Sequence, residues 1–364
     1  MQHVIRTSDT GQFKRCRVAW DFGSKIRQNF EYVAGLPPLD FGTAIHAGLE
    51  TYYKNKMLHG EVFSTRLNQA EAMMAYKEHM YDWKKRFLAD EAEPIIESPK
   101  YKVWYDHYQM GQGMLKHYFR WSKDQDEHWN ILHVEIEFEV PIPVVVPLQR
   151  KQRWVGFDTD TDGNLTYMND PIVFQGRIDM IAQDEDGHVW IVDHKTAAQF
   201  FNPDFYDINP QAERYVWALH QQLGIDVKGV IFNDLRKKVP KPPKLLKNGG
   251  LSKNKSQDTT VEEYMDAIKQ HGLNMEHYRD FLSTFKGQEY FRRVKTYRSK
   301  MQRKSVGEDI QLEAISMLSD PEIYRNATSF NCPGCMFKSP CEMKYNGGDV
   351  EWFLNHSGAY KKRS

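Results

Sequence analysis

Apolar and polar residues alternate strictly in one stretch near the middle of the chain. From His133 the sequence reads HVEIEFEVPIPVVV. It places four apolar side chains on one face and three glutamates on the other. The apolar positions are Val134, Ile136, Phe138 and Val140. This period of two residues predicts a β-strand with one buried face.

The segments that follow predict three more strands and one helix. Residues 172–183 and 188–197 predict two strands, and the acidic sequence DEDG between them predicts a turn. Residues 209–224 begin with a proline near the first turn, carry apolar residues at helical spacing and end at a glycine, which predicts a helix. Residues 227–235 predict the last strand. We therefore expect a compact α/β core over 131–235.

Helical spacing of apolar residues dominates both sides of this core. Residues 1–130 are mainly helical in pattern, and residues 259–364 continue a helical pattern to about 320 and end in a cysteine-rich region. Between them, residues 236–258 contain eight lysines or arginines and three prolines, which favours a mobile basic loop. Since there is no internal repeat and no clear linker, we expect residues 1–364 to form a single domain.

Composition limits the classes of partner. Lys plus Arg and Asp plus Glu each number 49, so nucleic acid would be attracted by local basic patches and not by the net charge. No apolar run approaches the roughly 18 residues of a membrane span. The first residues also lack an apolar signal region. We expect a soluble cytoplasmic protein with no membrane partner.

Two aspartates interrupt the predicted hairpin. Asp179 is expected near the end of one strand and Asp193 near the end of the next, so their carboxylates would lie side by side at one sheet edge. Lys195 projects from the same face as Asp193. Paired carboxylates repel one another unless a cation lies between them, and Mg²⁺ or Mn²⁺ prefers such oxygen ligands. With a lysine to orient or deprotonate water, this group predicts phosphodiester hydrolysis. The alternative is a surface hairpin in which Asp193 only pairs with a nearby lysine.

Three further polar residues are candidates for the same site. His46 lies in a predicted helix, and its imidazole is either another metal ligand or a histidine satisfied within the fold. Gln211 and Tyr215 are four residues apart and share one helix face. Their neutral donors suit phosphate oxygens or the orientation of Lys195, although such a pair is also common in a purely structural role.

The cysteines predict a metal site. Cys332, Cys335 and Cys341 lie close together near the end of the chain, and Cys16 lies near its start. A disulfide framework is not expected in a large chain without a secretion signal. Four thiolates accept either zinc or a [4Fe-4S] cluster, and spacing alone does not choose between them. Either metal would join the two ends of the chain.

Six motifs occur along the chain in the order found in RecB-like nucleases. They are F-x-x-C ending at Cys16, G-x-x-x-H ending at His46, G-x-x-D ending at Asp179, D-x-K-T beginning at Asp193, Q-x-x-x-Y from Gln211 to Tyr215, and the three late cysteines. On these motifs the chain resembles a RecB-like member of the PD-(D/E)xK nuclease superfamily. The resemblance is to the iron-sulfur branch that includes the AddB nuclease domain and CRISPR-associated exonucleases, and it extends to exonucleases encoded by tailed phages.

The resemblance implies an α/β fold with a restriction-endonuclease-like core, in which a mixed central sheet is flanked by helices. It also implies that the catalytic metal is held by three side chains and one main-chain carbonyl. These ligands are His46, Asp179, Asp193 and the carbonyl of His194. The expected activity is that of a metal-dependent DNA exonuclease acting on DNA ends or single strands.

The remaining motif residues take supporting roles in this resemblance. Lys195 would assist the nucleophilic water, and Gln211 and Tyr215 would support the active site or contact DNA. The four cysteines would bind a [4Fe-4S] cluster. A helicase, or a recombination or single-strand annealing protein, is the implied partner.

Candidate DNA contacts come from two regions. The basic segment offers phosphate contacts at Lys237, Lys238, Lys241, Lys244 and Lys247. Aromatic-rich helices at 101–129 offer base stacking. The alternatives are a solvated loop for the lysines and core packing for the aromatics. Two rival functions stay open: a non-catalytic nucleic-acid-binding or recombination partner protein on the same fold, and an RNA-directed nuclease.

Overall fold

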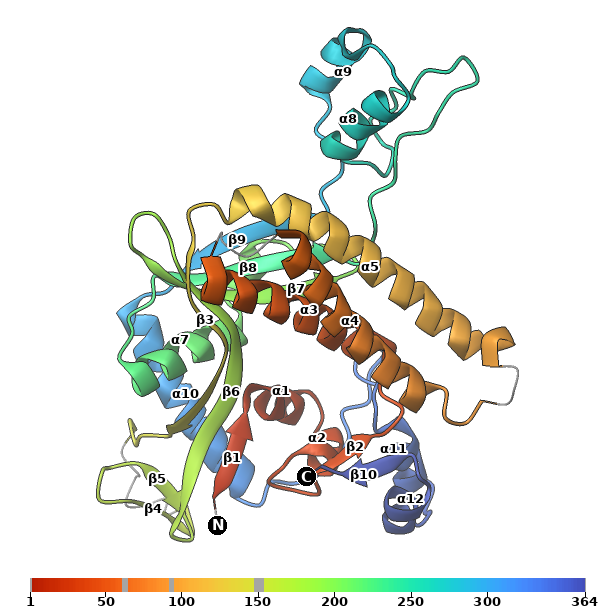
Figure 1. Cartoon of the computed structure of the whole chain (residues 1–364). Coiled ribbons are helices and arrows are strands. Elements are labelled where there is room, and N and C mark those ends of the chain that lie inside the picture. Colours follow the sequence, from red (N-terminus) through yellow and green to blue (C-terminus); the bar gives the residue numbers. More distant parts are fainter. Residues whose placement is uncertain (1, 61–64, 92–94, 147–153, 364) are drawn as a thin grey trace.

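The computed structural model describes residues 2–60, 65–91, 95–146 and 154–363 (Figure 1). The strands are β1 (His3–Arg6), β2 (Phe30–Tyr32), β3 (Asn130–Pro141), β4 (Phe157–Thr159), β5 (Leu165–Tyr167), β6 (Asp170–Gln183), β7 (Val189–Ala197), β8 (Gly229–Arg236), β9 (Phe291–Tyr297) and β10 (Tyr360–Lys362). The helices of the first half are α1 (Thr7–Arg15), α2 (Arg17–Gly23), α3 (Pro37–His59), α4 (Thr65–Phe87), η2 (Ile95–Glu97) and α5 (Pro99–Gln125). Those of the second half are α6 (Asp204–Asp207), α7 (Pro210–Leu223), α8 (Val261–Gln270), η3 (Met275–Tyr278), α9 (Arg279–Thr284), α10 (Lys300–Leu318), α11 (Lys338–Tyr345) and α12 (Val350–His356).

Strand β6 is the centre of a mixed sheet. Within the described ranges the sheet has eight strands in the order β4-β5-β6-β7-β8-β9, and β1 and β3 also pair with β6. Strands β6 and β7 are antiparallel, with Met180 opposite Val192. Strands β7 and β8 are parallel and are connected through α7, as a parallel pair requires. The predicted hairpin and the strand–helix–strand unit are both present.

Helices cover both faces of this sheet (Figure 1). Helices α7 and α10 pack on one face, and α3, α4 and α5 pack on the other. Successive residues of a strand point to opposite faces, so Ile191 belongs to the first core and Val192 to the second. The predicted α/β fold, a mixed central sheet flanked by helices, is confirmed. No helix in the described part of the chain is both long and apolar enough to span a membrane.

One strand lies where the sequence predicted only helix. Residues Phe291–Tyr297, FRRVKTY, form β9, with Phe291 opposite Leu235 of β8. Its three basic residues hide any clear alternation. Pairing with β8, more than 50 residues earlier in the chain, decides the conformation, so the prediction of helix from 259 to about 320 is wrong here. The short strands β1 and β2 likewise interrupt the mainly helical region 1–130.

The segment between β8 and β9 forms a small lobe, residues 237–290, that projects from the body of the protein (Figure 1). It has a hydrophobic cluster of its own. This cluster comprises Leu251, Tyr264, Ala267, Ile268, Tyr278, Phe281 and Phe285. Residues 237–258 contain no helix or strand, yet Leu251 is buried in the lobe. The mobility expected of this basic segment stays a prediction, but the segment is tied to a packed unit.

The two ends of the chain pack together at the other end of the molecule. Strand β2 pairs with β10, with Phe30 opposite Lys362. Asn29 Nδ2 donates a hydrogen bond to the main-chain oxygen of Arg363 at 3.0 Å. Val18 and other residues of α2 share one core with residues from the C-terminal region. The polypeptide itself therefore joins the ends that carry the cysteines.

Candidate active site

Asp193 and Lys195 project from the same face of β7 toward α7. Lys195 Nζ lies 2.7 Å from Asp193 Oδ2 and donates a hydrogen bond to Gln211 Oε1 at 2.6 Å. Gln211 Nε2 donates in turn to the hydroxyl of Tyr215 at 2.7 Å. Four residues predicted from the sequence therefore form one continuous polar row between the strand and the helix.

Local sequence accounts for this row. Residues two apart on a strand share a face, so the D-x-K sequence directs both charged side chains toward α7. Helix α7 begins after Asn209, whose side chain accepts a hydrogen bond from the N–H of Ala212 at 3.1 Å, and Pro210 occupies the first turn. This start places Gln211 in the first turn and Tyr215 one turn later on the same face.

Asp179 joins a second group of ligand-type side chains. His46 Nδ1, from α3, lies 3.4 Å from Asp179 Oδ1. The main-chain N–H of His194 donates to Asp179 Oδ2 at 2.7 Å. Glu135 of β3 completes the group, because ligand atoms of His46, Glu135 and Asp179 all lie within 4.8 Å of one another. The structure thus brings together two predicted residues and adds a third.

Glu135 was missed by sequence reasoning. The alternating pattern placed it with Glu137 and Glu139 on a polar strand face, and nothing distinguished the three. In the structure its side chain is 6% exposed and its Oε2 lies 2.7 Å from Arg177 Nε. Its φ of +53° is uncommon for a residue other than glycine, and the pairing register of β3 shifts between Ile131 and His133. Only the folded chain shows which glutamate turns into the site.

Both catalytic candidates on the hairpin lie in interior strands. We expected Asp179 and Asp193 at a sheet edge near strand ends, and this is wrong. Strand β6 lies between β3 and β7, and β7 lies between β6 and β8. The register that pairs Met180 with Val192 makes the two aspartates the next positions along the ladder. Their burial inside the sheet strengthens every charge interaction between them.

Burial and neighbouring charges shift the pKa values of this group. Burial opposes ionisation of Asp179, but His46 and the His194 N–H outweigh it and hold the pKa of this carboxyl below its usual range. Burial, followed by repulsion from Asp179, raises the pKa of Glu135 to about 7. Burial raises the pKa of Asp193 although Lys195 opposes the shift. Each carboxylate has one positively charged neighbour, and repulsion between the carboxylates still raises the pKa of Glu135 and Asp193, an effect that a bound cation would relieve.

The side chain of His194 faces the opposite helical layer. Burial lowers the pKa of this imidazole to about 3, so the ring is neutral. Its Nδ1 lies 2.8 Å from the amide nitrogen of Asn233, which also donates to the hydroxyl of Tyr118 at 2.8 Å. The Tyr118 hydroxyl lies 2.6 Å from that of Tyr53. These contacts anchor β7 to α3 and α5, and they leave the main chain of His194 beside Asp179.

The donor set suits a hard divalent cation. An imidazole nitrogen from His46 and carboxylate oxygens from Glu135 and Asp179 are ligand types that Mg²⁺ and Mn²⁺ accept. Asp193 offers a further carboxylate, whose Oδ2 is in contact with Lys195. These residues therefore fit a Mg²⁺ or Mn²⁺ ion, and the individual roles of the ligands stay predictions.

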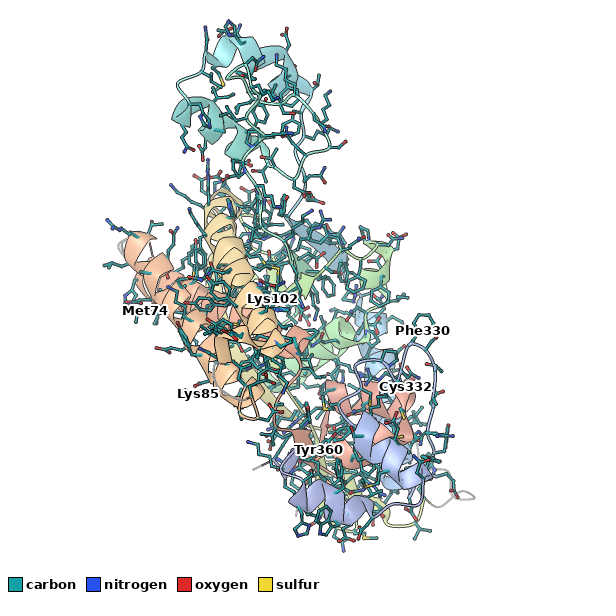
Figure 2. All side chains as sticks on the ribbon, turned by 90° about the vertical axis from the view of Figure 1, so that its right-hand side faces the viewer. Met74, Lys85, Lys102, Phe330, Cys332 and Tyr360 are labelled. Atoms are coloured by element: carbon teal, nitrogen blue, oxygen red, sulfur yellow. The ribbon has the colours of Figure 1, made fainter. Side chains whose placement is uncertain are left out.

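The four cysteines surround one cavity of about 200 Å³. Cys16 reaches it from the start of α2, and Cys332, Cys335 and Cys341 reach it from the C-terminal region. Figure 2 shows Cys332 in this region, at the opposite end of the molecule from the lobe. All four cysteines are among the described residues, and no three of their sulfur atoms lie within 4.8 Å of one another. The structure therefore places Cys16 beside the three late cysteines, and the choice between zinc and a [4Fe-4S] cluster stays a prediction.

The predicted DNA-contacting lysines have unequal surroundings. Lys237 Nζ donates to the main-chain oxygen of Pro38 at 3.3 Å, and burial lowers the pKa of this ammonium. Lys238 Nζ lies 2.5 Å from Asp258 Oδ1. The other three are exposed on the lobe: Lys241, Lys244 and Lys247. Lys241, Lys244 and Lys247 are therefore the predicted lysines whose side chains are accessible to nucleic acid.

Most large aromatic residues of α5 serve the core. Trp104, Tyr118 and Phe119 are buried against α3 and α4, whereas Tyr105 is exposed. Core packing, the alternative raised for these helices, accounts for the buried ones.

An α/β sheet with Asp-x-Lys on an interior strand, beside a histidine and two more carboxylates, defines a metal-dependent hydrolytic site. A profile of the PD-(D/E)XK nuclease superfamily matches residues 7–342, and the chain belongs to this superfamily. The match spans all the site residues described above. Membership indicates a nuclease, which is a hydrolase that usually works with Mg²⁺ or Mn²⁺. A comparison with curated proteins found no match.

Proposed function

We propose that this protein is a metal-dependent DNA exonuclease of the RecB-like, iron-sulfur type. The observation that carries the proposal is the placement of Lys195 between Asp193 and Gln211. A purely structural hairpin has no need to bury two aspartates side by side, because buried like charges destabilise the fold. The order of the six sequence motifs supports the RecB-like assignment.

The metal would be held by a histidine, carboxylates and one main-chain carbonyl. These ligands are His46, Asp179, Asp193 and the carbonyl of His194, with Glu135 as a further carboxylate. When bound, the ion would polarise the scissile phosphate and lower the pKa of a coordinated water. The interior position of the two aspartates keeps their geometry rigid around it.

Lys195 would act on the water or on the phosphate. Its ammonium has three N–H groups. One is donated to Gln211 and another points to Asp193, and 28% of the side chain is exposed. The third N–H is then available to orient the attacking water or to stabilise negative charge on a phosphate oxygen. Gln211, held by Tyr215, fixes the direction in which the ammonium points.

The four cysteines would bind a [4Fe-4S] cluster. Four cysteines lining one cavity are the ligand set that such a cluster accepts, and the resemblance to the iron-sulfur branch supports the cluster over zinc. The cluster would reinforce the contact between the two ends of the chain that β2 and β10 already make. Its role would be structural, since its ligands come from both ends of the chain.

The remaining parts of the proposal concern the substrate and the setting. The protein would degrade DNA from ends or in single strands, with the exposed lysines of the lobe contacting phosphates. A helicase or a single-strand annealing protein would supply the DNA. By its resemblance to tailed-phage exonucleases, the chain would be phage-encoded and act in the host cytoplasm.

The experiment is cleavage of end-labelled DNA by anaerobically purified protein. Single-stranded and duplex substrates are incubated with Mg²⁺, Mn²⁺ or EDTA, beside Asp193→Ala and the exposed-turn control Asp186→Ala. We expect metal-dependent shortening from one end by the wild type and by the control, and none by Asp193→Ala, which still binds DNA. A parallel assay on end-labelled RNA tests the rival substrate, and cleavage of RNA but not of DNA would make the protein a ribonuclease. Wild-type-like cleavage by Asp193→Ala would refute the site.

A further inference from the structure

The lobe ends in a hairpin with two exposed leucines. In this leucine hairpin, residues 244–252, Leu245 is 48% exposed and Leu246 is 40% exposed. A single exposed leucine is ordinary, but two adjacent exposed leucines beside the turn of a projecting hairpin form an apolar patch that the core of the lobe leaves uncovered.

The tip is built from specific main-chain hydrogen bonds. Leu245 and Leu251 form a β-bridge. The N–H of Leu246 donates to the oxygen of Gly250 at 2.8 Å, and the N–H of Gly249 donates to the oxygen of Leu246 at 3.0 Å. Gly249 has a φ of +82°, which suits glycine and closes the turn. The leucines are therefore presented by a defined turn.

The core of the lobe holds the hairpin in place. Leu251 is buried in that core, and its N–H donates to the hydroxyl of Tyr278 at 2.9 Å. The hydroxyl of Tyr264 donates to the oxygen of Ser252 at 3.1 Å. Since the return strand is anchored at both residues, little ordering entropy remains to be lost when the tip binds a ligand.

The surroundings of the tip are basic. Residues 236–256 contain eight lysines or arginines and no acidic residue. Lys244 and Lys247 flank the leucines and are exposed. Neither makes an ion pair with any residue in the described ranges. Apolar side chains between free ammonium groups match a ligand that has flat apolar surfaces between phosphates.

The base of the lobe lies beside the candidate active site. Strand β8 runs parallel to β7 with Asp193 opposite Phe232, and the lobe begins directly after Arg236, four residues farther along. Lys237 at that base contacts Pro38 at the start of α3, the helix that carries His46. Figure 1 and Figure 2 both show the lobe projecting away from the body. The lobe is thus joined to the body beside β7 and α3, the elements that carry Asp193, Lys195 and His46.

We propose that the leucine hairpin is a wedge that enters the base stack of double-stranded nucleic acid. Leu245 and Leu246 insert between bases, and Lys244 and Lys247 contact the phosphates on either side. Unstacking of a base step by an inserted leucine separates the strands ahead of the hydrolytic site. The inference rests on the proposed nucleic-acid substrate and adds how the duplex is opened.

The test measures base unstacking without cleavage. Duplexes carrying 2-aminopurine at successive positions from one end are titrated with protein in EDTA, and fluorescence reports unstacking. We expect the wild type to increase fluorescence at one or two adjacent positions. The double variant Leu245→Gln/Leu246→Gln loses this increase but keeps its melting temperature and its single-strand binding. Leu312→Gln, which alters a leucine of α10 that is 43% exposed, serves as the matched control and behaves as the wild type.

A second variant tests the phosphate contacts. Lys244→Gln/Lys247→Gln should reduce the slope of log affinity against log salt for duplex DNA by about 2, since each lost phosphate contact is worth roughly 0.9. An unchanged slope overturns the phosphate contacts.

The outcomes separate the wedge from the nuclease. Unstacking by a wild type that cleaves nothing keeps the wedge and refutes the nuclease. Unaltered unstacking by the leucine variant, or no duplex binding by the wild type, overturns the wedge. Binding to anionic lipid vesicles that the leucine variant abolishes, with no effect on unstacking, assigns the tip to a membrane surface instead.

Discussion

Gln211 Oε1 accepts a hydrogen bond of 2.6 Å from Lys195 Nζ. This contact joins the first turn of α7 to the middle of the sheet. The position of the ammonium thus depends on a neutral amide from another element, and the amide is itself held by the hydroxyl of Tyr215. Replacing the Gln211 amide tests whether catalysis depends on the orientation of the Lys195 ammonium as well as on its charge.

Gln211→Leu should lower kcat for DNA cleavage by about 100-fold, a loss expected when a catalytic group is misdirected. The affinity for Mn²⁺ should change little, because Gln211 is not among the proposed ligands. Single-turnover cleavage and calorimetric Mn²⁺ titration measure the two effects. Gln221→Leu, on an exposed turn of the same helix, is the control. An unchanged kcat in Gln211→Leu would show that Lys195 needs no orienting partner.

Metal binding should release protons and strengthen as pH rises. Burial lowers the pKa of His46, but Asp179 outweighs it and raises the pKa to about 9, so the metal-free imidazole is charged at neutral pH. A metal ligand must be deprotonated. Mn²⁺ affinity should therefore increase up to about pH 9, and calorimetry in buffers of different ionisation enthalpy should detect the released proton. His46→Ala should abolish the release above pH 7, whereas the exposed-site control His128→Ala should retain it.

The same imidazole should make the metal-free protein less stable at high pH. Its pKa in the folded state lies above the value of about 6.5 expected in the unfolded chain, so its stabilising contribution is complete below about pH 6.5 and is lost as pH rises through about 9. Exposure of 31% of the side chain screens part of this effect. Urea unfolding in EDTA at pH 6 and pH 9.5 measures it. Equal pH dependence in wild type and His46→Ala would contradict the assignment.

Cys335→Ala should remove the cluster and lower the melting temperature by several degrees, because a bound structural metal stabilises the fold. Iron, sulfide and zinc contents measured on anaerobically purified protein identify the metal. Ser339→Ala, at an exposed position of α11, should keep both metal and stability. Zinc in place of iron would refute the [4Fe-4S] cluster but keep a metal site that joins the two ends of the chain. An unchanged melting temperature would refute any stabilising role of that site.

Arg293→Met should reduce the free energy of unfolding by about 3–5 kcal/mol, the usual cost of leaving a buried charge without its partner. The side chain of Asp126 is fully buried and pairs with Arg293, with Lys56 Nζ 3.1 Å from its other oxygen. Urea unfolding measures the loss, and Lys295→Met, at an exposed position of the same strand, is the control. A loss below about 1 kcal/mol would mean that Lys56 alone neutralises the aspartate.

Several features of the site follow from short-range sequence pattern. The alternation after His133, the hairpin around DEDG and the start of α7 at Pro210 depend on backbone geometry over a few residues. The same reasoning placed Asp193 and Lys195 on one face. It also placed Gln211 and Tyr215 on another, and the structure brings the two faces into contact.

Other features were decided by contacts between distant segments. The carboxylate of Glu135 lies in the site because β3 pairs with β6 in a register that sets it between the Val134–Met180 and Ile136–Ile178 pairs, beside Asp179. Residues Phe291–Tyr297, FRRVKTY, form the strand β9 because they pair with the edge of β8. The spacing of the sulfur atoms depends on how Cys16 packs against the C-terminal region, which no local pattern encodes. The sequence alone thus determined the periodic elements and the chemistry each one carries, because both depend on neighbouring residues. Only the tertiary structure decided which side chains meet, because pairing register and burial depend on residues far apart along the chain.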